Sequence, residues 1–193
     1  MKIGVLSVQG AVSEHLGHLE RCNVEAINVK NESSLEAVCG LIIPGGESTT
    51  IGKLIEHFGL SESIKERAQR GKLALFGTCA GMILIAREIT DGLEGQPRLE
   101  LMDIKVQRNA FGRQRESFEA DLKFDGFEGL LTGVFIRAPI IEKTGPGVEV
   151  LAEVPEGIVA ARQGNILVTS FHPELTDDLR VHQYFVEMCS KVN

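Results

Sequence analysis

The apolar run at residues 73–76 (L-A-L-F), followed by a glycine-flanked cysteine, is the feature that most constrains the fold of this chain. A short run of consecutive apolar residues is typical of a central strand that is buried on both faces of a parallel sheet. A second apolar run, residues 82–86, predicts the inner face of a helix. Because Gly77 and Gly81 permit a tight turn between the two runs, the sequence predicts a strand, a turn that presents the Cys79 sulfur, and a helix.

The segment G-T-C-A-G itself has two interpretations. A cysteine between small residues is often only a small buried hydrophobe. At a strand-to-helix turn, by contrast, the backbone N–H groups of the helix start favour a thiolate or an oxyanion, as at a nucleophile elbow. The pentapeptide alone leaves both interpretations open, so the rest of the chain has to decide between them.

The order of the remaining segments predicts the fold class. In the first half, strands are expected at residues 2–8, 24–29, 41–43 and 73–76, and helices at 12–21, 49–58 and 61–70. The second half predicts shorter strands at 103–107, 117–122, 133–137, 148–154, 158–162 and 166–170, and then a helix over 176–191. We therefore expect a single α/β domain over residues 1–193. Its three layers comprise a mostly parallel open sheet flanked by helices, with extra antiparallel strands in the second half.

Composition and charge argue against several classes of partner. The chain has 20 Lys and Arg against 27 Asp and Glu, and a net charge of −7 does not favour nucleic acid as the main partner. The longest mostly apolar segment, residues 73–86, is too short and too interrupted to span a membrane. The four cysteines match no zinc-binding spacing and indicate a reducing, cytoplasmic setting; they are Cys22, Cys39, Cys79 and Cys189. No metal and no cofactor are expected.

Three polar segments follow the predicted central strands. They are residues 44–50, 77–81 and 171–174, and each is rich in Gly, Pro or polar side chains. In open α/β sheets, ligands bind at the carboxyl ends of the strands, where such segments meet. The sequence therefore predicts a ligand site built from these three turns.

The tetrapeptide F-H-P-E supplies what a cysteine nucleophile needs. Pro173 favours an extended backbone at His172, which places His172 and Glu174 on one face, about 6.6 Å apart. A cysteine nucleophile requires a base, and the base requires an orienting acceptor. Cys79, His172 and Glu174 are accordingly a candidate triad. The same tetrapeptide also fits a plain turn in which Glu174 begins the next helix.

The other four histidines lie in predicted helices and favour a solvated or packed role. They are His15, His18, His57 and His182, of which the first two are placed where they can pair with Glu residues.

The turn P-G-G-E-S-T-T is a candidate oxyanion site. Gly45 and Gly46 allow backbone N–H groups to approach a ligand closely, and one of them together with the N–H of Ala80 would form an oxyanion hole. The alternative is structural, because Ser48 or Thr49 is a good N-cap for the following helix.

Arginines mark a possible carboxylate site. The segment 108–115 (R-N-A-F-G-R-Q-R) is basic within an acidic protein and fits a substrate carboxylate, a partner surface or a solvated loop. Arg137 lies at the end of a predicted strand, where a structural ion pair is an equally good interpretation.

Taken together, these segments resemble a known family. G-T-C-A-G with H-P-E resembles the class I, triad-type glutamine amidotransferases. The segments V-L-S-V-Q-G, I-I-P-G-G-E-S-T-T, R-N-A-F-G-R-Q and F-I-R-A-P are similar to those of the glutaminase subunits of pyridoxal 5′-phosphate synthases, and they span nearly the whole chain in order. The resemblance implies hydrolysis of L-glutamine to L-glutamate and ammonia. It also implies that the ammonia passes to a (β/α)₈ synthase subunit within a large hetero-oligomer, and that activity depends on this docking.

The resemblance also implies roles for individual residues. Cys79 would attack the side-chain amide, His172 would accept and return the proton, and Glu174 would orient His172. The N–H groups of Gly46 and Ala80 would form the oxyanion hole. Gln9 matches a position near the oxyanion hole and the synthase contact. The positions that match glutamine-binding residues are Gly46, Glu47, Ser48, Arg108, Ile136 and Arg137.

Three rival functions make different predictions. A peptidase-like cysteine hydrolase would act on a peptide or ester without a partner, but it does not account for G-G-E-S-T-T or the arginine-rich segment. A non-catalytic regulatory module would lack part of the triad, and all three residues are present. An α/β-hydrolase places its acid before its histidine, whereas here His172 precedes Glu174.

Overall fold

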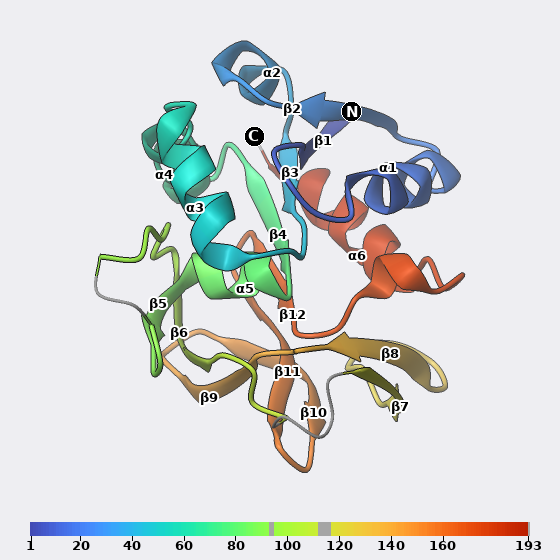
Figure 1. Ribbon diagram of the computed structural model, residues 1–193. Coiled ribbons are helices and arrows are strands. Elements are labelled where there is room, and N and C mark those ends of the chain that lie inside the picture. The colour runs from blue at the N-terminus through green and yellow to red at the C-terminus, as the bar shows by residue number, and fades with distance from the viewer. Residues whose placement is uncertain (93–94, 112–116, 193) are drawn as a thin grey trace.

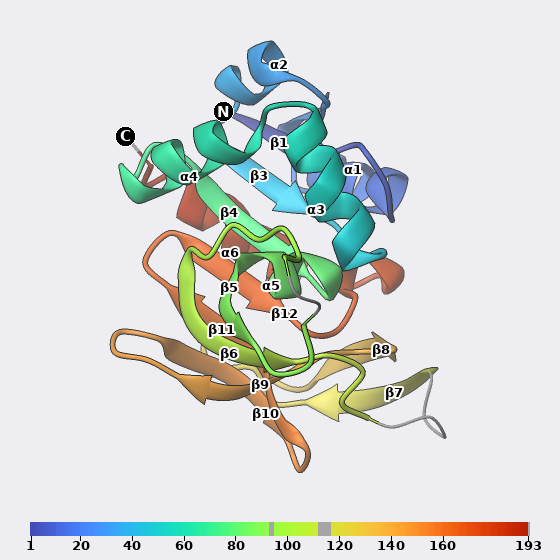
Figure 2. The ribbon, with the colours of Figure 1, turned by 60° about the vertical axis from the view of Figure 1, so that its left-hand side comes forward.

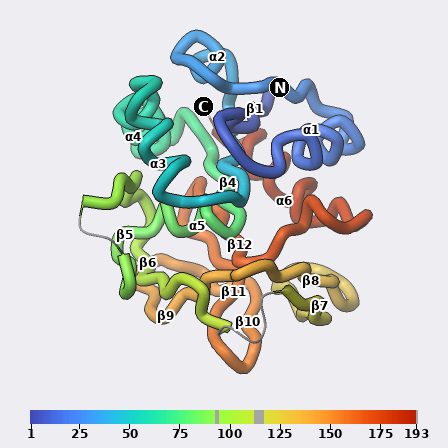
Figure 3. Tube along the Cα trace, in the orientation of Figure 1, coloured from blue at the N-terminus to red at the C-terminus, as the bar shows by residue number. Residues whose placement is uncertain are grey.

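The computed structural model describes residues 1–92, 95–111 and 117–192 and contains one large twisted sheet (Figure 1). One half of this sheet is parallel. Its strands, in spatial order, are β2 (Glu25–Val29), β1 (Lys2–Leu6), β3 (Gly40–Ile43), β4 (Ala74–Thr78) and β12 (Ile166–Thr169). Figure 3 shows β12 beside β4, although the two strands come from opposite halves of the chain.

The other half of the sheet is mainly antiparallel. It continues from β12 through β11 (Gly157–Gln163), β9 (Ile140–Thr144), β6 (Met102–Gln107) and β5 (Ala86–Ile89), and β10 (Glu149–Val154) also pairs with β11. Within this half, β5 and β6 run parallel to each other. A separate antiparallel pair consists of β7 (Ser117–Leu122) and β8 (Leu131–Ile136). Figure 2 shows β7 to β10 as a layer beneath the parallel half.

Helices cover both faces of the parallel half (Figure 1). The side chains of α1 (Val12–Arg21) and α6 (Arg180–Cys189) join the hydrophobic cluster on one face. The cluster on the other face contains side chains from α2 (Glu32–Glu36), α3 (Ser48–His57), α4 (Ser61–Gln69) and α5 (Ala80–Ile85). The fold is therefore the expected three-layer α/β arrangement with antiparallel strands added in the second half.

Strand β4 is buried along its whole length and separates the two hydrophobic clusters. Because successive residues of a strand point to opposite faces, Phe76 packs on one side, where its ring lies 5.5 Å from that of Phe185 in α6. Leu75 packs on the other side. Fully burying side chains of this size contributes about 1.5–3 kcal/mol each, so the burial of β4 holds both helical layers in place.

The end of the chain differs from the prediction. The helix expected over residues 176–191 begins only at Arg180, after a short 3₁₀ turn at Pro173–Leu175. Between the two, the Asp178 carboxylate accepts a hydrogen bond from the Arg180 backbone N–H at 3.0 Å. Asp side chains that bond nearby backbone in this way favour turns over helix interiors, which explains the late start.

The hydrophobic pattern does not predict several other short elements or their ends. The helix expected to include residues 82–86 ends at Ile85, and Ala86 adopts an extended backbone and begins β5. The short elements α2, β5 and β9 were not predicted, because four or five residues carry too little periodicity to reveal them.

Substitution of Gly81, near the start of α5, tests how tightly this helix packs against β3 and β4. A Cβ added at Gly81 would overlap the Ile43 carbonyl oxygen, whereas one added at Gly17 in α1 would meet no atom within 4 Å. We expect Gly81→Ala to lower the free energy of unfolding by about 1–3 kcal/mol through overpacking. Gly17→Ala should raise it by about 0.5–1 kcal/mol. Urea unfolding of both variants measures this, and equal midpoints would contradict the packing.

Candidate active site

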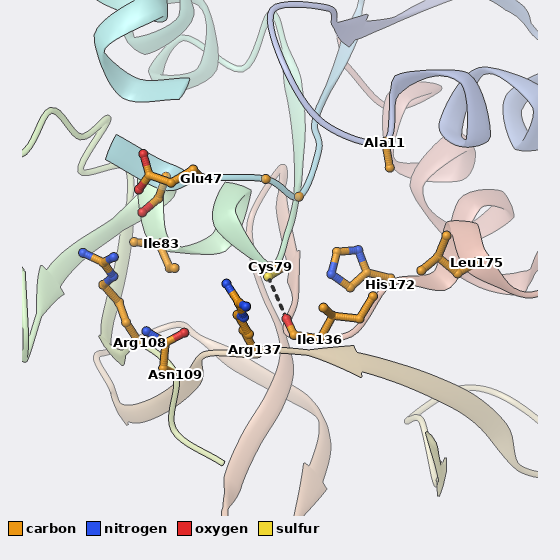
Figure 4. Close-up of a pocket in the computed structure, with 13 residues that line it drawn as sticks. Ala11, Glu47, Cys79, Ile83, Arg108, Asn109, Ile136, Arg137, His172 and Leu175 are labelled. Atoms are coloured by element: carbon orange, nitrogen blue, oxygen red, sulfur yellow. Dashed lines mark hydrogen bonds between the residues drawn. The ribbon is translucent and has the colours of Figure 1, made fainter. Parts of the chain in front are cut away.

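The three polar turns meet in one cavity, as the order of the strands requires. Strands β3, β4 and β12 are neighbours, so their carboxyl ends lie side by side. The turns that follow them contribute Gly45, Gly46, Cys79 and His172 to a cavity of about 550 Å³ (Figure 4).

Cys79 occupies a strained turn between β4 and α5. Its backbone has φ 49° and ψ −99°, a conformation that costs a non-glycine residue about 1–3 kcal/mol. The Cys79 backbone N–H donates to the Thr169 carbonyl oxygen at 2.8 Å, which ties the turn to β12. Cys79 is 8% exposed, and its thiol donates to the Ile136 carbonyl oxygen at 3.8 Å (Figure 4). Ala80 begins α5, so its N–H has no acceptor within the helix.

His172 lies between Cys79 and a buried carboxylate. Its Nδ1 is 2.7 Å from Oε1 of Glu174, which leaves Nε2 for the hydrogen bond with Cys79. Burial lowers the pKa of His172, but the hydrogen bonds and charges of Cys79 and Glu174 outweigh it and raise the pKa to about 10. A Cβ on Gly45 would overlap Cε1 of the imidazole, so the first glycine of the turn makes room for His172.

Glu174 lies in a turn, and its side chain also faces the imidazole of His172. It lies in the 3₁₀ turn Pro173–Leu175 that precedes α6, and its carboxylate contacts His172. The side chain is fully buried. Among the described residues, His172 and His15 are the basic side chains that lie within 4 Å of its carboxylate.

The side of the cavity away from His172 carries the two arginines. In Figure 4, Arg108 points toward the turn that holds Glu47, and Arg137 points toward the turn that holds Cys79. The sequence-predicted substrate residues line this cavity together: Gly46, Glu47, Ser48, Arg108, Ile136 and Arg137. Asn109, from the same arginine-rich segment, also lines it. Residues 112–115 of that segment lie outside the described residues.

Gln96 is a site residue that the sequence did not reveal. Its amide N–H donates to Ser48 Oγ at 3.2 Å, and its amide oxygen accepts from Arg108 Nη1 at 3.3 Å. Gln96 thus joins two cavity-lining side chains from different layers. It lies on a loop without a motif, so only the fold brings it to the cavity.

The cap of α3 corrects the sequence interpretation. The structural alternative for this turn is a cap by Ser48 or Thr49, but the Glu47 carboxylate accepts from Thr49 N at 3.0 Å and from Thr50 N at 2.7 Å. Ser48 is instead buried and bonded to Gln96. Burial raises the pKa of Glu47, but the hydrogen bonds from Thr50 and Thr49 outweigh it and lower the pKa to about 2.

Gln9 lies behind the turn that holds Gly46 and Glu47. Its side-chain oxygen accepts from the Glu47 backbone N–H at 3.2 Å. A Cβ on Gly46 would stand 3.2 Å from the same oxygen. Gln9 therefore fixes the turn from outside the cavity, whereas Gly46 lines the cavity.

The remaining histidines divide into two groups. His57 is exposed, whereas His15, His18 and His182 are buried and packed against one another. His15 pairs with a Glu, as the sequence suggested for this helix, but the partner is Glu174 of the candidate triad.

A model of the SNO glutamine amidotransferase family matches residues 5–191. The chain belongs to this family. It is 57% identical over 190 residues to the pyridoxal 5′-phosphate synthase subunit PdxT of Pelotomaculum thermopropionicum, covering 98% of this chain and 95% of that protein. It is 56% identical over 188 residues to the subunit of the same name from Geobacillus kaustophilus, covering 97% and 94%.

Solved structures agree with the family assignment. A crystal structure of a glutamine amidotransferase superposes with a TM-score of 0.93 at 51% identity, covering 97% of this chain and 98% of the other. The structure of PurLQS from Thermotoga maritima has a TM-score of 0.66 at 17% identity, covering 96% and 97%, and supports the fold alone.

The described residues contain no cluster of three or more His, Cys, Asp or Glu side chains suited to a metal ion. Among the same residues, no helix has the length and apolar character needed to cross a membrane.

Acid titration tests the Glu47 cap. Because the pKa of Glu47 falls from 4.5 to about 2 on folding, the charged cap stabilises the protein above pH 4.5 and is lost as the pH falls toward 2. We expect Glu47→Ala to lower the free energy of unfolding by about 1 kcal/mol at pH 7. Urea unfolding should show that the difference in the free energy of unfolding between Glu47→Ala and the parent protein becomes smaller below pH 4.5.

Glu56→Ala, at an exposed carboxylate near the other end of α3, is the matched control and should show no such pH-dependent gap. A gap for Glu47→Ala that stays constant from pH 7 to pH 3 would contradict the capping role.

Proposed function

We propose that this chain hydrolyses L-glutamine to L-glutamate and ammonia through Cys79, His172 and Glu174. We further propose that it delivers the ammonia to a pyridoxal 5′-phosphate synthase subunit for vitamin B6 synthesis. The observation that carries the chemistry is the alignment of a strained cysteine, an imidazole and a buried carboxylate at one cavity. The substrate and the pathway rest on the family match and on the names of the relatives.

The first half of the reaction is acylation. Because its pKa is raised to about 10, His172 holds the proton of the Cys79 thiol on Nε2 from the start, and the sulfur attacks the side-chain amide carbon of glutamine. The hydrogen bond from His172 Nδ1 to Glu174 stabilises the imidazolium that forms. His172 then gives the proton to the departing nitrogen, so that ammonia leaves and a glutamyl thioester remains. In the second half, water activated by His172 hydrolyses the thioester and regenerates the thiol.

Binding groups for both ends of glutamine line the cavity. The N–H groups of Gly46 and Ala80 are proposed to stabilise the tetrahedral oxyanion, since Gly46 lines the cavity with Cys79 and Ala80 follows Cys79 in the first turn of α5. Arg108 or Arg137 is suited to the α-carboxylate because a guanidinium matches a carboxylate in geometry and charge. The backbone of Ile136 and the Glu47–Ser48 turn offer acceptors for the α-ammonium group.

The mouth of the cavity supports the proposed partner. Leu175 and Ile136 line it and expose 45% and 39% of their surface, although they are large apolar residues. Exposed apolar groups beside a polar site are typical of a surface that another protein covers. The proposed partner is a (β/α)₈ synthase subunit in a large hetero-oligomer, with the reaction taking place in the cytoplasm.

Removal of the nucleophile tests the chemistry. We expect Cys79→Ala to decrease ammonia release from glutamine by at least about 10⁴-fold, because no other group in the proposal replaces the thiolate. Cys22→Ala, which alters a half-buried cysteine outside the cavity, should retain full activity. Ammonia release is measured by a coupled assay, and an unchanged urea midpoint shows that Cys79→Ala folds. Full activity of Cys79→Ala would refute the assignment.

Docking dependence is tested separately. Because a partner is expected to cover the cavity mouth, the purified chain should hydrolyse glutamine slowly and should be activated at least about tenfold by its synthase subunit. Titrating the synthase into the ammonia assay gives the activation and its midpoint. Equal turnover with and without the synthase would refute the dependence. Hydrolysis of peptides or esters by the chain alone would favour the rival cysteine hydrolase.

A further inference from the structure

A group of buried histidines extends inward from the candidate triad. His15 of α1 and His182 of α6 are both fully buried. His15 Nε2 lies 3.5 Å from Glu174 Oε1 and 3.3 Å from Thr78 Oγ1. On the other side of the ring, His15 Nδ1 lies 2.9 Å from His182 Nε2. The chain of contacts therefore runs from His172 through Glu174 and His15 to His182.

His15 and His182 are both neutral. Burial, followed by the repulsion that a second positive charge would meet beside the imidazoles of His182, His172 and His18, holds the pKa of His15 well below its ordinary value. Burial, followed by the charge of His18, lowers the pKa of His182 to about 3. A neutral imidazole has one N–H and one bare nitrogen, so each contact fixes which atom carries the proton.

Only one arrangement of these protons suits the carboxylate. A proton on His15 Nδ1 would turn the lone pair of Nε2 toward the negative Glu174. A proton on His15 Nε2 instead presents an N–H to Glu174 and Thr78, and Nδ1 then accepts from His182 Nε2–H. This arrangement leaves His182 Nδ1 bare, and that atom meets no hydrogen-bonding group in the described residues. Each of the two rings therefore has its single N–H directed at an acceptor.

We propose that His15 is a positioning residue for the triad. Its Nε2–H holds the Glu174 carboxylate in line with His172, and His182 sets the required tautomer of His15. At 3.5 Å the contact with Glu174 is long for a hydrogen bond, so the N–H is shared with the Thr78 hydroxyl and acts mainly by electrostatic attraction. Because Thr78 directly precedes Cys79, His15 also connects the nucleophile turn with the acid of the triad.

The test rests on the proposed function and uses the chain together with its synthase subunit. His15→Phe keeps a buried ring but removes both nitrogens. We expect kcat for glutamine hydrolysis to fall about 10–100-fold, with KM changed less than about threefold, because His15 does not line the substrate cavity. His15→Gln should recover most of kcat, since its amide offers an N–H to Glu174 and an oxygen to His182.

His18→Phe is the matched control. His18 is buried one turn further along α1, but its nitrogens contact only the carbonyl oxygens of Glu14 and Thr176. It should retain kcat even where its urea midpoint falls as far as that of His15→Phe. Equal losses of kcat in the two variants, or no recovery in His15→Gln, would overturn the proposal. An inactive parent complex would instead refute the glutaminase function.

A double-mutant cycle tests the part assigned to His182. His182→Phe should lower kcat on its own, because His15 then loses the partner that sets its tautomer. In the His15→Phe background the same change should cost no further kcat, since His182 acts only through His15. Losses of kcat that simply add would show that the two histidines act independently, and would overturn the coupling.

Discussion

The parallel pairing of β3, β4 and β12 is the constraint on which the rest of the structure depends. In the register of these strands, Gly77 of β4 lies opposite Ile43, and Thr78 lies opposite Thr169, so the three strands end at the same level. The Cys79 N–H to Thr169 bond continues the ladder by one residue. A slip of one residue would move a strand by about 3.3 Å and reverse its faces, which would separate the cysteine from its histidine.

Two features of the site are unfavourable in free energy by themselves and persist because the surrounding structure packs against them. Cys79 adopts a positive φ, and Glu174 is a carboxylate in the protein interior. Both features cost free energy, and a buried charge is tolerated only where polar partners surround it. His172 and His15 provide such partners at one oxygen of Glu174, Oε1. Glycines at positions 45 and 81 let the imidazole and α5 approach the neighbouring backbone, so close packing and chemistry depend on the same residues.

The antiparallel half of the chain completes the cavity that the parallel half begins. Strand β8 ends at Ile136, whose carbonyl accepts from the Cys79 thiol, and Arg137 follows it. The His172 backbone N–H donates to the Val134 carbonyl oxygen at 2.8 Å, which fixes the histidine turn to β8. Arg108 follows β6. The parallel half thus carries Cys79 and the Gly45–Gly46 turn, which are the proposed nucleophile and oxyanion site, while the antiparallel half carries the arginines proposed for the substrate's charged end.

The sequence by itself determined the elements that have a strong hydrophobic periodicity or a run of consecutive apolar residues. It predicted the buried strands, the amphipathic helices, the turn at Cys79 and the convergence of three turns, because apolar patterning and strand-end geometry are local properties. Only the tertiary structure decided that Glu47 rather than Ser48 caps α3, and that Gln96 and His15 reach the site. The contacts of Gln96 and His15 join segments that lie far apart in the chain. Their distances are set by how the layers pack, and no local pattern encodes that packing.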